Sequence, residues 1–121
     1  MLTVKGVDES RRQELAECFG DPRVQALILR EDENETGGVV YTMDPQEMRL
    51  LRFWTEDPFL RDFLLRATLN IGWRRGVKEA RCALADMREF LLQEGFEADE
   101  NEAFVTIGAF FTRPCPGHDH K

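Results

Sequence analysis

The sequence lacks the features that mark several large protein classes. No apolar run approaches the roughly 18 residues of a membrane-spanning helix, and the N-terminus has no apolar signal-peptide segment. Its three cysteines lie far apart, which favours reduced thiols over a disulfide framework. The net charge is −7 and the charged runs REDENE and EADENE are acidic, which argues against nucleic-acid binding. We therefore expect a soluble, cytoplasmic protein that binds neither membranes nor nucleic acid.

The length of 121 residues suits one domain, because a chain of this size buries about two thirds of the surface that its unfolded form exposes. No internal repeat or long linker divides the chain. We expect a single domain over residues 1–112 and a C-terminal tail over residues 113–121. Cys18 and Cys82 are expected to be small core residues.

Turn residues and apolar spacing predict an α+β fold with a mixed, mostly antiparallel sheet flanked by helices. The predicted elements are a helix at 10–19, strands at 26–31, 38–43 and 47–56, a long helix at 58–75, a strand at 77–84, a helix at 87–94 and a strand at 102–111. Short connections favour an antiparallel meander for the three consecutive strands. The strand after the long helix should lie parallel to the strand before it.

Capping residues and apolar spacing support the predicted helices. Ser10 with Gln13 fits a capping box, Gly20 fits a left-handed C-cap, and Asp86 with Glu89 fits a second capping box. The long helix carries apolar residues at helical spacing, widened by two leucines. These residues are Leu60, Phe63, Leu64, Ala67 and Ile71, with Leu65 and Leu69.

This order of elements, with the segments RRG and FLLQEGF, resembles the GNAT superfamily of N-acetyltransferases over nearly the whole chain. The resemblance implies a GNAT-like fold that binds acetyl-CoA where the strand at 47–56 meets the long helix. It also implies a groove between splayed parallel strands, lined by Phe53, Trp54 and Thr55. This groove would take a small-molecule or peptide ligand, and Arg61 would lie beside a bound cofactor.

The strand–helix junction departs from the GNAT pattern, in which a glycine-containing loop holds the pyrophosphate. Here the junction reads Glu56-Asp57-Pro58 and contains no glycine. Glycine allows close approach of backbone to phosphate, whereas proline has no N–H group to donate. We expect the helix to begin near Pro58 with Asp57 as its N-cap, which would use donors that a phosphate needs. The sequence thus predicts a pyrophosphate site that has degenerated.

The expected catalytic groups of the family also differ. Leu91 occupies the position at which the family often has a tyrosine that protonates the leaving thiolate. Tyr41 lies on a predicted strand, where we expect it to be a packing residue. Glu56 is the candidate general base. We predict a diverged relative, either a weak acyl-CoA-dependent N-acetyltransferase or a non-catalytic protein that binds a small ligand.

The tail contains a second motif. Cys115, His118 and His120 form a Cys-x-x-His-x-His pattern, and thiolate and imidazole are the ligands that zinc prefers. A metal-binding or partner-binding module is therefore the alternative function. Phe110-Phe111, just before the tail, would be the buried end of the last strand, or a homodimer contact if exposed.

Overall fold

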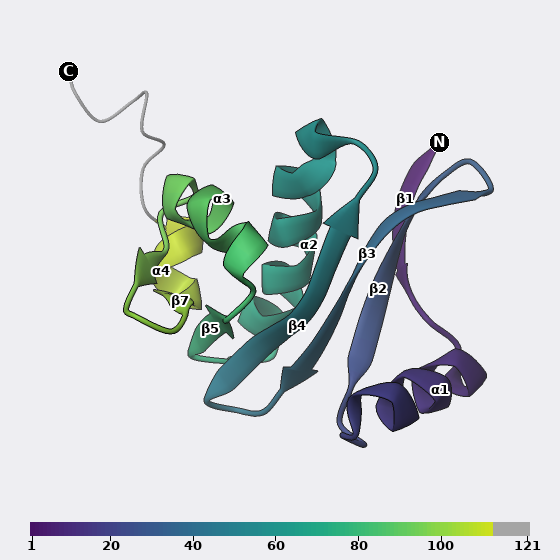
Figure 1. Cartoon of the computed structure of the whole chain (residues 1–121), viewed down its shortest axis with the longest axis horizontal. Coiled ribbons are helices and arrows are strands. Elements are labelled where there is room, and N and C mark those ends of the chain that lie inside the picture. The colour runs from purple at the N-terminus through teal and green to yellow at the C-terminus, as the bar shows by residue number, and fades with distance from the viewer. Residues whose placement is uncertain (113–121) are drawn as a thin grey trace.

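The structure, a computed structural model, describes residues 1–112, which form one mixed sheet with helices on both faces (Figure 1). The strands are β1 (Leu2–Gly6), β2 (Gln25–Glu31), β3 (Asn34–Met43), β4 (Glu47–Thr55), β5 (Glu79–Cys82), β6 (Glu97–Ala98) and β7 (Ala103–Thr106). The helices are α1 (Glu9–Phe19), α2 (Arg61–Arg74), α3 (Arg88–Gln93) and α4 (Ile107–Thr112), with 3₁₀ turns η1 (Pro58–Leu60) and η2 (Ala85–Met87).

The sheet confirms the predicted fold class. Its strands lie in the order β1-β2-β3-β4-β5-β7-β6, and every neighbouring pair is antiparallel except β4 with β5. The predicted meander is β2-β3-β4, and α2 connects the two parallel strands. Helix α1 lies on one face of the sheet, whereas α2 lies on the other (Figure 1). Within residues 1–112, no helix is both long and apolar enough to span a membrane.

Strand β1 is an element that the sequence pattern does not predict. Its side chains are exposed or half-buried, so it lacks the clear alternation of a strand with one face in the core. It forms the sheet edge by pairing with β2, and the pairing ends where Gly6 lies opposite Leu27. Pairing with the edge of β2, rather than a local sequence pattern, therefore defines this strand.

Helix α1 confirms its predicted end but not its predicted start. Gly20 has φ 68° and ends the helix in the left-handed conformation. The N-cap is Asp8 rather than Ser10, because the Asp8 carboxylate accepts a hydrogen bond of 2.9 Å from the Arg11 N–H group. The core prediction for Cys18 is wrong, since this thiol is exposed.

The buried face of α2 is rotated from the predicted one. Leu64, Leu65 and Leu69 are fully buried, whereas Phe63 is 42% exposed. Thr68 is also buried, and its hydroxyl donates a 2.8 Å hydrogen bond to the Leu64 carbonyl, which satisfies this polar group inside the core. Leu65 and Leu69, which lie at the margin of the predicted apolar stripe, thus lie at the centre of the buried face.

The last predicted strand is wrong in its second half, because β7 ends at Thr106 and α4 follows. The helix turns Phe110 into the core, where it is 4% exposed, so the predicted burial is correct although the element is not. Phe111 packs edge-on against Trp73 of α2, with ring centroids 5.0 Å apart. The aromatic pair thus contacts its own chain.

A cluster of charged side chains holds β4, β5 and the start of β7 together. Arg49 and Arg81 lie side by side on the parallel strands, a placement that is unfavourable for like charges. Glu102 offsets it by accepting hydrogen bonds of 2.7 Å from Arg49 and 2.6 Å from Arg81. These hydrogen bonds, that from Arg49 first, lower the pKa of the Glu102 carboxyl.

Glu102→Gln should lower the free energy of unfolding by about 2 kcal/mol near neutral pH, because two half-buried guanidinium groups lose their shared carboxylate. A carboxyl group whose pKa is lower in the folded than in the unfolded state stabilises the protein at pH values above its unfolded-state pKa. This contribution is lost as the pH falls through the folded-state pKa. The difference between native and variant protein should therefore shrink below about pH 4. Urea unfolding at neutral and acid pH measures the difference in free energy of unfolding between the two proteins. A difference that does not change with pH would contradict a stabilising role of the Glu102 carboxylate.

Candidate groove between β4 and β5

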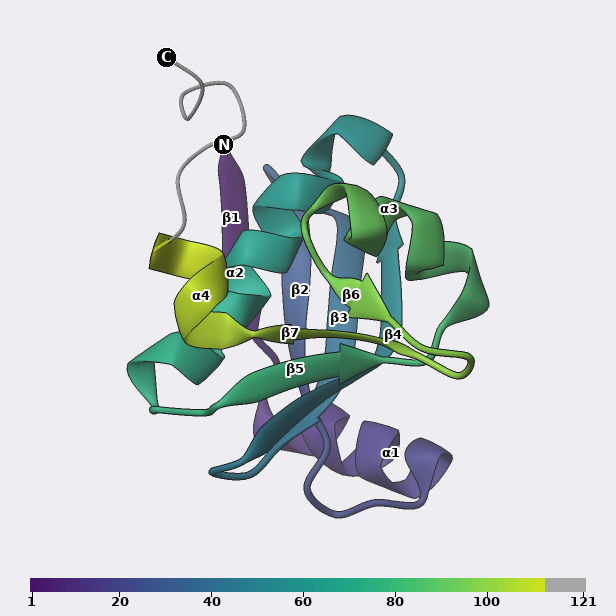
Figure 2. The same ribbon diagram turned by 90° about the vertical axis from the view of Figure 1, so that its left-hand side faces the viewer.

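The candidate site lies where the two parallel strands separate. β4 and β5 pair only from Glu47 opposite Glu79 to Leu50 opposite Cys82. Beyond Leu50, no described strand continues the ladder on this side of β4, so the backbone edge of its second half is open. Figure 2 shows β5 and β7 crossing in front of the meander, away from the upper half of β4.

A cavity of about 380 Å³ occupies this opening. One wall comes from β4 and the junction to α2, and the other comes from η2. The lining residues are Phe53, Trp54, Thr55, Glu56, Pro58, Arg61, Asp86 and Met87. The structure thus places all four predicted cofactor-binding residues, and the candidate base Glu56, around one cavity.

The junction into α2 uses its own backbone donors. The Phe59 N–H group donates to the Asp57 carboxylate at 2.9 Å, and the Leu60 N–H group donates to the Asp57 carbonyl at 3.0 Å. The Arg61 N–H group donates to the Pro58 carbonyl, and Pro58 itself has no N–H group. The helical segment thus begins at Pro58 with Asp57 as its cap, as predicted, although its first turn is a 3₁₀ turn. Because these donors are already paired, they are not available to a phosphate.

The charges around the cavity also oppose a polyanion. Glu56 and Asp86 face it from opposite walls, and Arg61 is the only cation among the lining residues. The Arg61 guanidinium lies 5.1 Å from the centre of the Phe90 ring, where it makes a cation–π contact. Two carboxylates against one guanidinium leave a negative lining.

Solved structures with the same fold come from several bacteria. A GNAT family acetyltransferase from Elizabethkingia anophelis, with acetyl-CoA bound, has a TM-score of 0.67 at 9% identity, covering 82% of this chain and 78% of its own. An acetyltransferase of the GNAT family from Staphylococcus aureus has a TM-score of 0.63 at 11% identity, with coverages of 88% and 99%. FeeM, an N-acyl amino acid synthase from uncultured soil microbes, has a TM-score of 0.71 at 10% identity, with coverages of 91% and 92%.

This chain has a GNAT-like fold. The likeness lies in the fold, because the identities are low and the coverage is nearly complete for both partners. No family model and no curated protein matches the sequence. The resemblance seen in the order of elements is therefore confirmed by the structure, at a level that sequence similarity does not reach.

Trp54 reaches its place in the GNAT-like domain through a glycine on the neighbouring strand. Gly38 pairs with Trp54, and a Cβ atom at Gly38 would lie 2.5 Å from the indole ring. The ring therefore crosses β3 where only glycine leaves room. Arg52 covers the ring from above, at 5.0 Å from its centre.

Three other side chains considered for function, Leu91, Tyr41 and Cys82, are not among the residues that line this cavity. Leu91 is fully buried in the core, and Tyr41 lines a different cavity near the end of α2. Cys82 is buried where the strands separate, as predicted, and burial raises the pKa of its thiol, so the thiol stays protonated. Glu56 and Asp86 are thus the titratable acids that line the groove.

Asp86 is the lining residue that sequence reasoning assigned to a different role. The predicted cap is wrong, because neither η2 nor α3 has a side-chain cap hydrogen bond. Asp86 instead lines the groove opposite Glu56. Its position shortly after a strand parallel to β4 could have indicated this, since the carboxyl ends of parallel strands share one edge.

The predicted metal ligands Cys115, His118 and His120 lie outside the described residues, so the zinc site stays a prediction. Within residues 1–112, no group of three or more histidine, cysteine or acidic side chains is arranged to hold a metal ion.

Proposed function

We propose that this chain is a diverged GNAT-like protein that binds a small acyl thioester in the groove between β4 and β5. The groove would bind the acyl-pantetheine part of acyl-CoA, and the nucleotide part would contribute little to the affinity. The observation that carries the proposal is the open edge of β4 beside a cavity of ligand size. An extended chain that contains amides can pair with such an edge as an additional strand would.

Weak binding of the nucleotide follows from the junction. A pyrophosphate at the start of α2 would meet N–H groups that are already paired, and it would lie near Glu56 and Asp57. Each like-charge pair about 4 Å apart costs between roughly 1 and 4 kcal/mol, depending on solvent exposure. These terms oppose CoA without affecting the acyl-pantetheine part.

Acetyl transfer would be slow in this site. An amine that attacks the thioester carbonyl must lose a proton, which Glu56 or Asp86 could accept. The departing thiolate must gain a proton, yet neither a phenol nor a thiol lines the described groove. The site therefore supports binding better than it supports turnover, which matches a weak transferase or a non-catalytic relative.

Calorimetry with acetyl-CoA, S-acetylpantetheine and 3′,5′-ADP tests the proposal. We expect S-acetylpantetheine to bind within about threefold of acetyl-CoA, and 3′,5′-ADP to give no heat. The NMR signals of the Trp54 and Thr55 amides locate the ligand, because both residues line the groove. If acetyl-CoA binds about 100-fold more tightly than S-acetylpantetheine, the protein has a functional pyrophosphate-binding site, and the proposal is wrong. Absence of binding at about 5 mM of either thioester would also overturn the proposal.

A further inference from the structure

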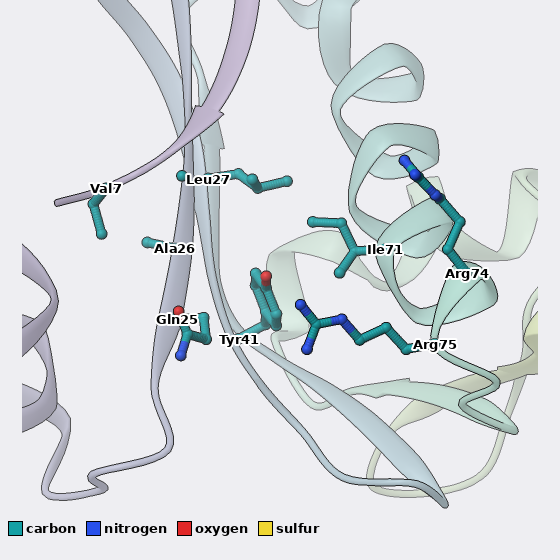
Figure 3. Close-up of a pocket in the computed structure, with 9 residues that line it drawn as sticks. Val7, Gln25, Ala26, Leu27, Tyr41, Ile71, Arg74 and Arg75 are labelled. Carbon is teal, nitrogen blue, oxygen red and sulfur yellow. The ribbon is translucent and has the colours of Figure 1, made fainter. Parts of the chain in front are cut away.

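A second cavity, of about 530 Å³, lies between the sheet and the end of α2 (Figure 3). Its walls come from β1, β2, β3 and the last turn of α2. The groove described above lies at the other end of this helix, and 14 residues at about 1.5 Å each separate the two ends by roughly 20 Å. The lining residues are Gly6, Val7, Gln25, Ala26, Leu27, Tyr41, Ile71, Arg74 and Arg75.

Tyr41 brings a polar group to this cavity. The residue is only 5% exposed. No fully buried side-chain N or O atom of the described residues lacks a hydrogen-bond partner, so the Tyr41 hydroxyl, which has no such bond there, is open to the cavity rather than sealed in the core. Figure 3 shows Tyr41 and Arg75 projecting toward each other from β3 and from the end of α2. Burial raises the pKa of the Tyr41 hydroxyl, against a smaller opposite effect of Arg75, so the phenol is protonated and can donate.

Arg74 and Arg75 differ from every other arginine in the described part of the chain. Neither guanidinium has an ion pair, a side-chain hydrogen bond or an aromatic ring as partner there, whereas each of the others has at least one. The others are Arg11, Arg12, Arg23, Arg30, Arg49, Arg66 and Arg81 with carboxylates, Arg52 and Arg61 with aromatic rings, and Arg88 with a carbonyl. In a chain of net charge −7, two consecutive arginines that lack such partners within residues 1–112 stand out.

The C-terminal end of α2 explains only part of this placement. A helix C-terminus carries about half a negative charge, which one arginine in the last turn would balance. Two guanidinium groups carry more positive charge than the helix C-terminus can balance, and they leave the cavity positive. Leu27 and Ile71 supply apolar walls between the polar groups. The cavity thus combines a positive, donor-rich end with an apolar body.

We propose that this cavity binds a small organic anion, a carboxylate or a phosphate monoester with an apolar body. The oxygens of its anionic group would be held by Arg75 and the Tyr41 hydroxyl, which project toward each other, and Arg74 would add positive charge at the same end of the cavity. The apolar part of the ligand would lie between Leu27 and Ile71. Guanidinium groups match the two-oxygen geometry that carboxylates and phosphates share. This site is separate from the groove and does not depend on thioester binding.

Titrations of the full chain with phenyl phosphate, benzoate and neutral benzamide test the proposal. The readouts are calorimetry and the NMR signals of the Ile71 methyl groups and the Arg75 amide. We expect at least one anion to bind with a Kd below about 1 mM, and benzamide to bind at least about tenfold more weakly. A preference for phenyl phosphate assigns the site to phosphate esters, and a preference for benzoate assigns it to carboxylates.

Matched variants locate the binding. Arg75→Gln should weaken the preferred anion about tenfold, because a charge-assisted hydrogen bond is lost. Tyr41→Phe should weaken it several-fold while keeping the ring in place. Arg66→Gln removes the same charge from α2 at a residue paired with Asp62, and it should leave binding unchanged. Failure of both anions to shift these signals at about 10 mM, or equal binding by Arg75→Gln, would overturn the proposal. The NMR signals of the Trp54 and Thr55 amides should not respond to either anion, which separates this result from that for the groove.

Discussion

Leu91→Ala should lower the free energy of unfolding by about 3 kcal/mol, a large part of the 5–15 kcal/mol typical of a domain. Leu91 is fully buried on α3, so truncation removes apolar contacts and leaves a cavity. The chain offers a matched control in the next residue, since Leu92 is 45% exposed. Leu92→Ala should change stability by no more than about 0.5 kcal/mol.

Equilibrium unfolding in guanidinium chloride measures both variants, with equal m-values as the check that each remains two-state. The result bears on function because the position of Leu91 resembles that of the tyrosine acid in GNAT enzymes. A large effect at Leu91 alone means that this position now serves packing. Similar small effects at both leucines would mean that the position is free to present a side chain to the groove, and this interpretation of the site would be wrong.

Glu56→Gln with Asp57→Asn should raise the affinity for acetyl-CoA about tenfold, which corresponds to about 1.4 kcal/mol. The two substitutions remove the charges nearest to a pyrophosphate at the junction. Asparagine at position 57 can still accept the hydrogen bond that the Asp57 carboxylate now accepts from Phe59, so the start of the helix is preserved. The affinity for S-acetylpantetheine should stay the same, because this ligand has no pyrophosphate.

A control with the same change of net charge is Glu14→Gln with Glu17→Gln, which removes two carboxylates from α1 on the opposite face of the sheet. This control should leave the affinity for both thioesters unchanged. Calorimetry at two salt concentrations adds a second check, since an effect of charge weakens as salt screens it. Equal gains from both double variants would point to net charge rather than to the junction.

Local interactions account for what the sequence predicts well. The Asp57 cap depends on an acidic residue directly before Pro58, and the end of α1 depends on Gly20, so neighbours in the chain suffice for both. The meander is also predicted, because short connections leave adjacent strands little choice but to pair in antiparallel fashion. Errors appear where a partner is distant, as in β1, which forms only against β2.

The residues of the two candidate sites also divide into those that the sequence predicts and those that depend on distant partners. The resemblance to GNAT proteins implies that Phe53, Trp54, Thr55 and Arg61 lie at one site, and these residues are close in sequence and line one cavity. Asp86 on the opposite wall was assigned to a helix cap, since its approach to Glu56 depends on where β5 ends. Tyr41 was expected to pack, and it is indeed buried, yet the cavity that it shares with Arg75 has no trace in the local sequence.

The sequence by itself determined the order of the main elements, the capped start of α2 and the absence of glycine from the junction before α2, because each depends on residues that are close together in the chain. Only the tertiary structure decided which side chains face each other across the groove and across the second cavity. Those encounters depend on the parallel pairing of β4 with β5 ending at Leu50 and on the placement of α2 over the sheet. Long-range packing fixes both, and no local pattern encodes it.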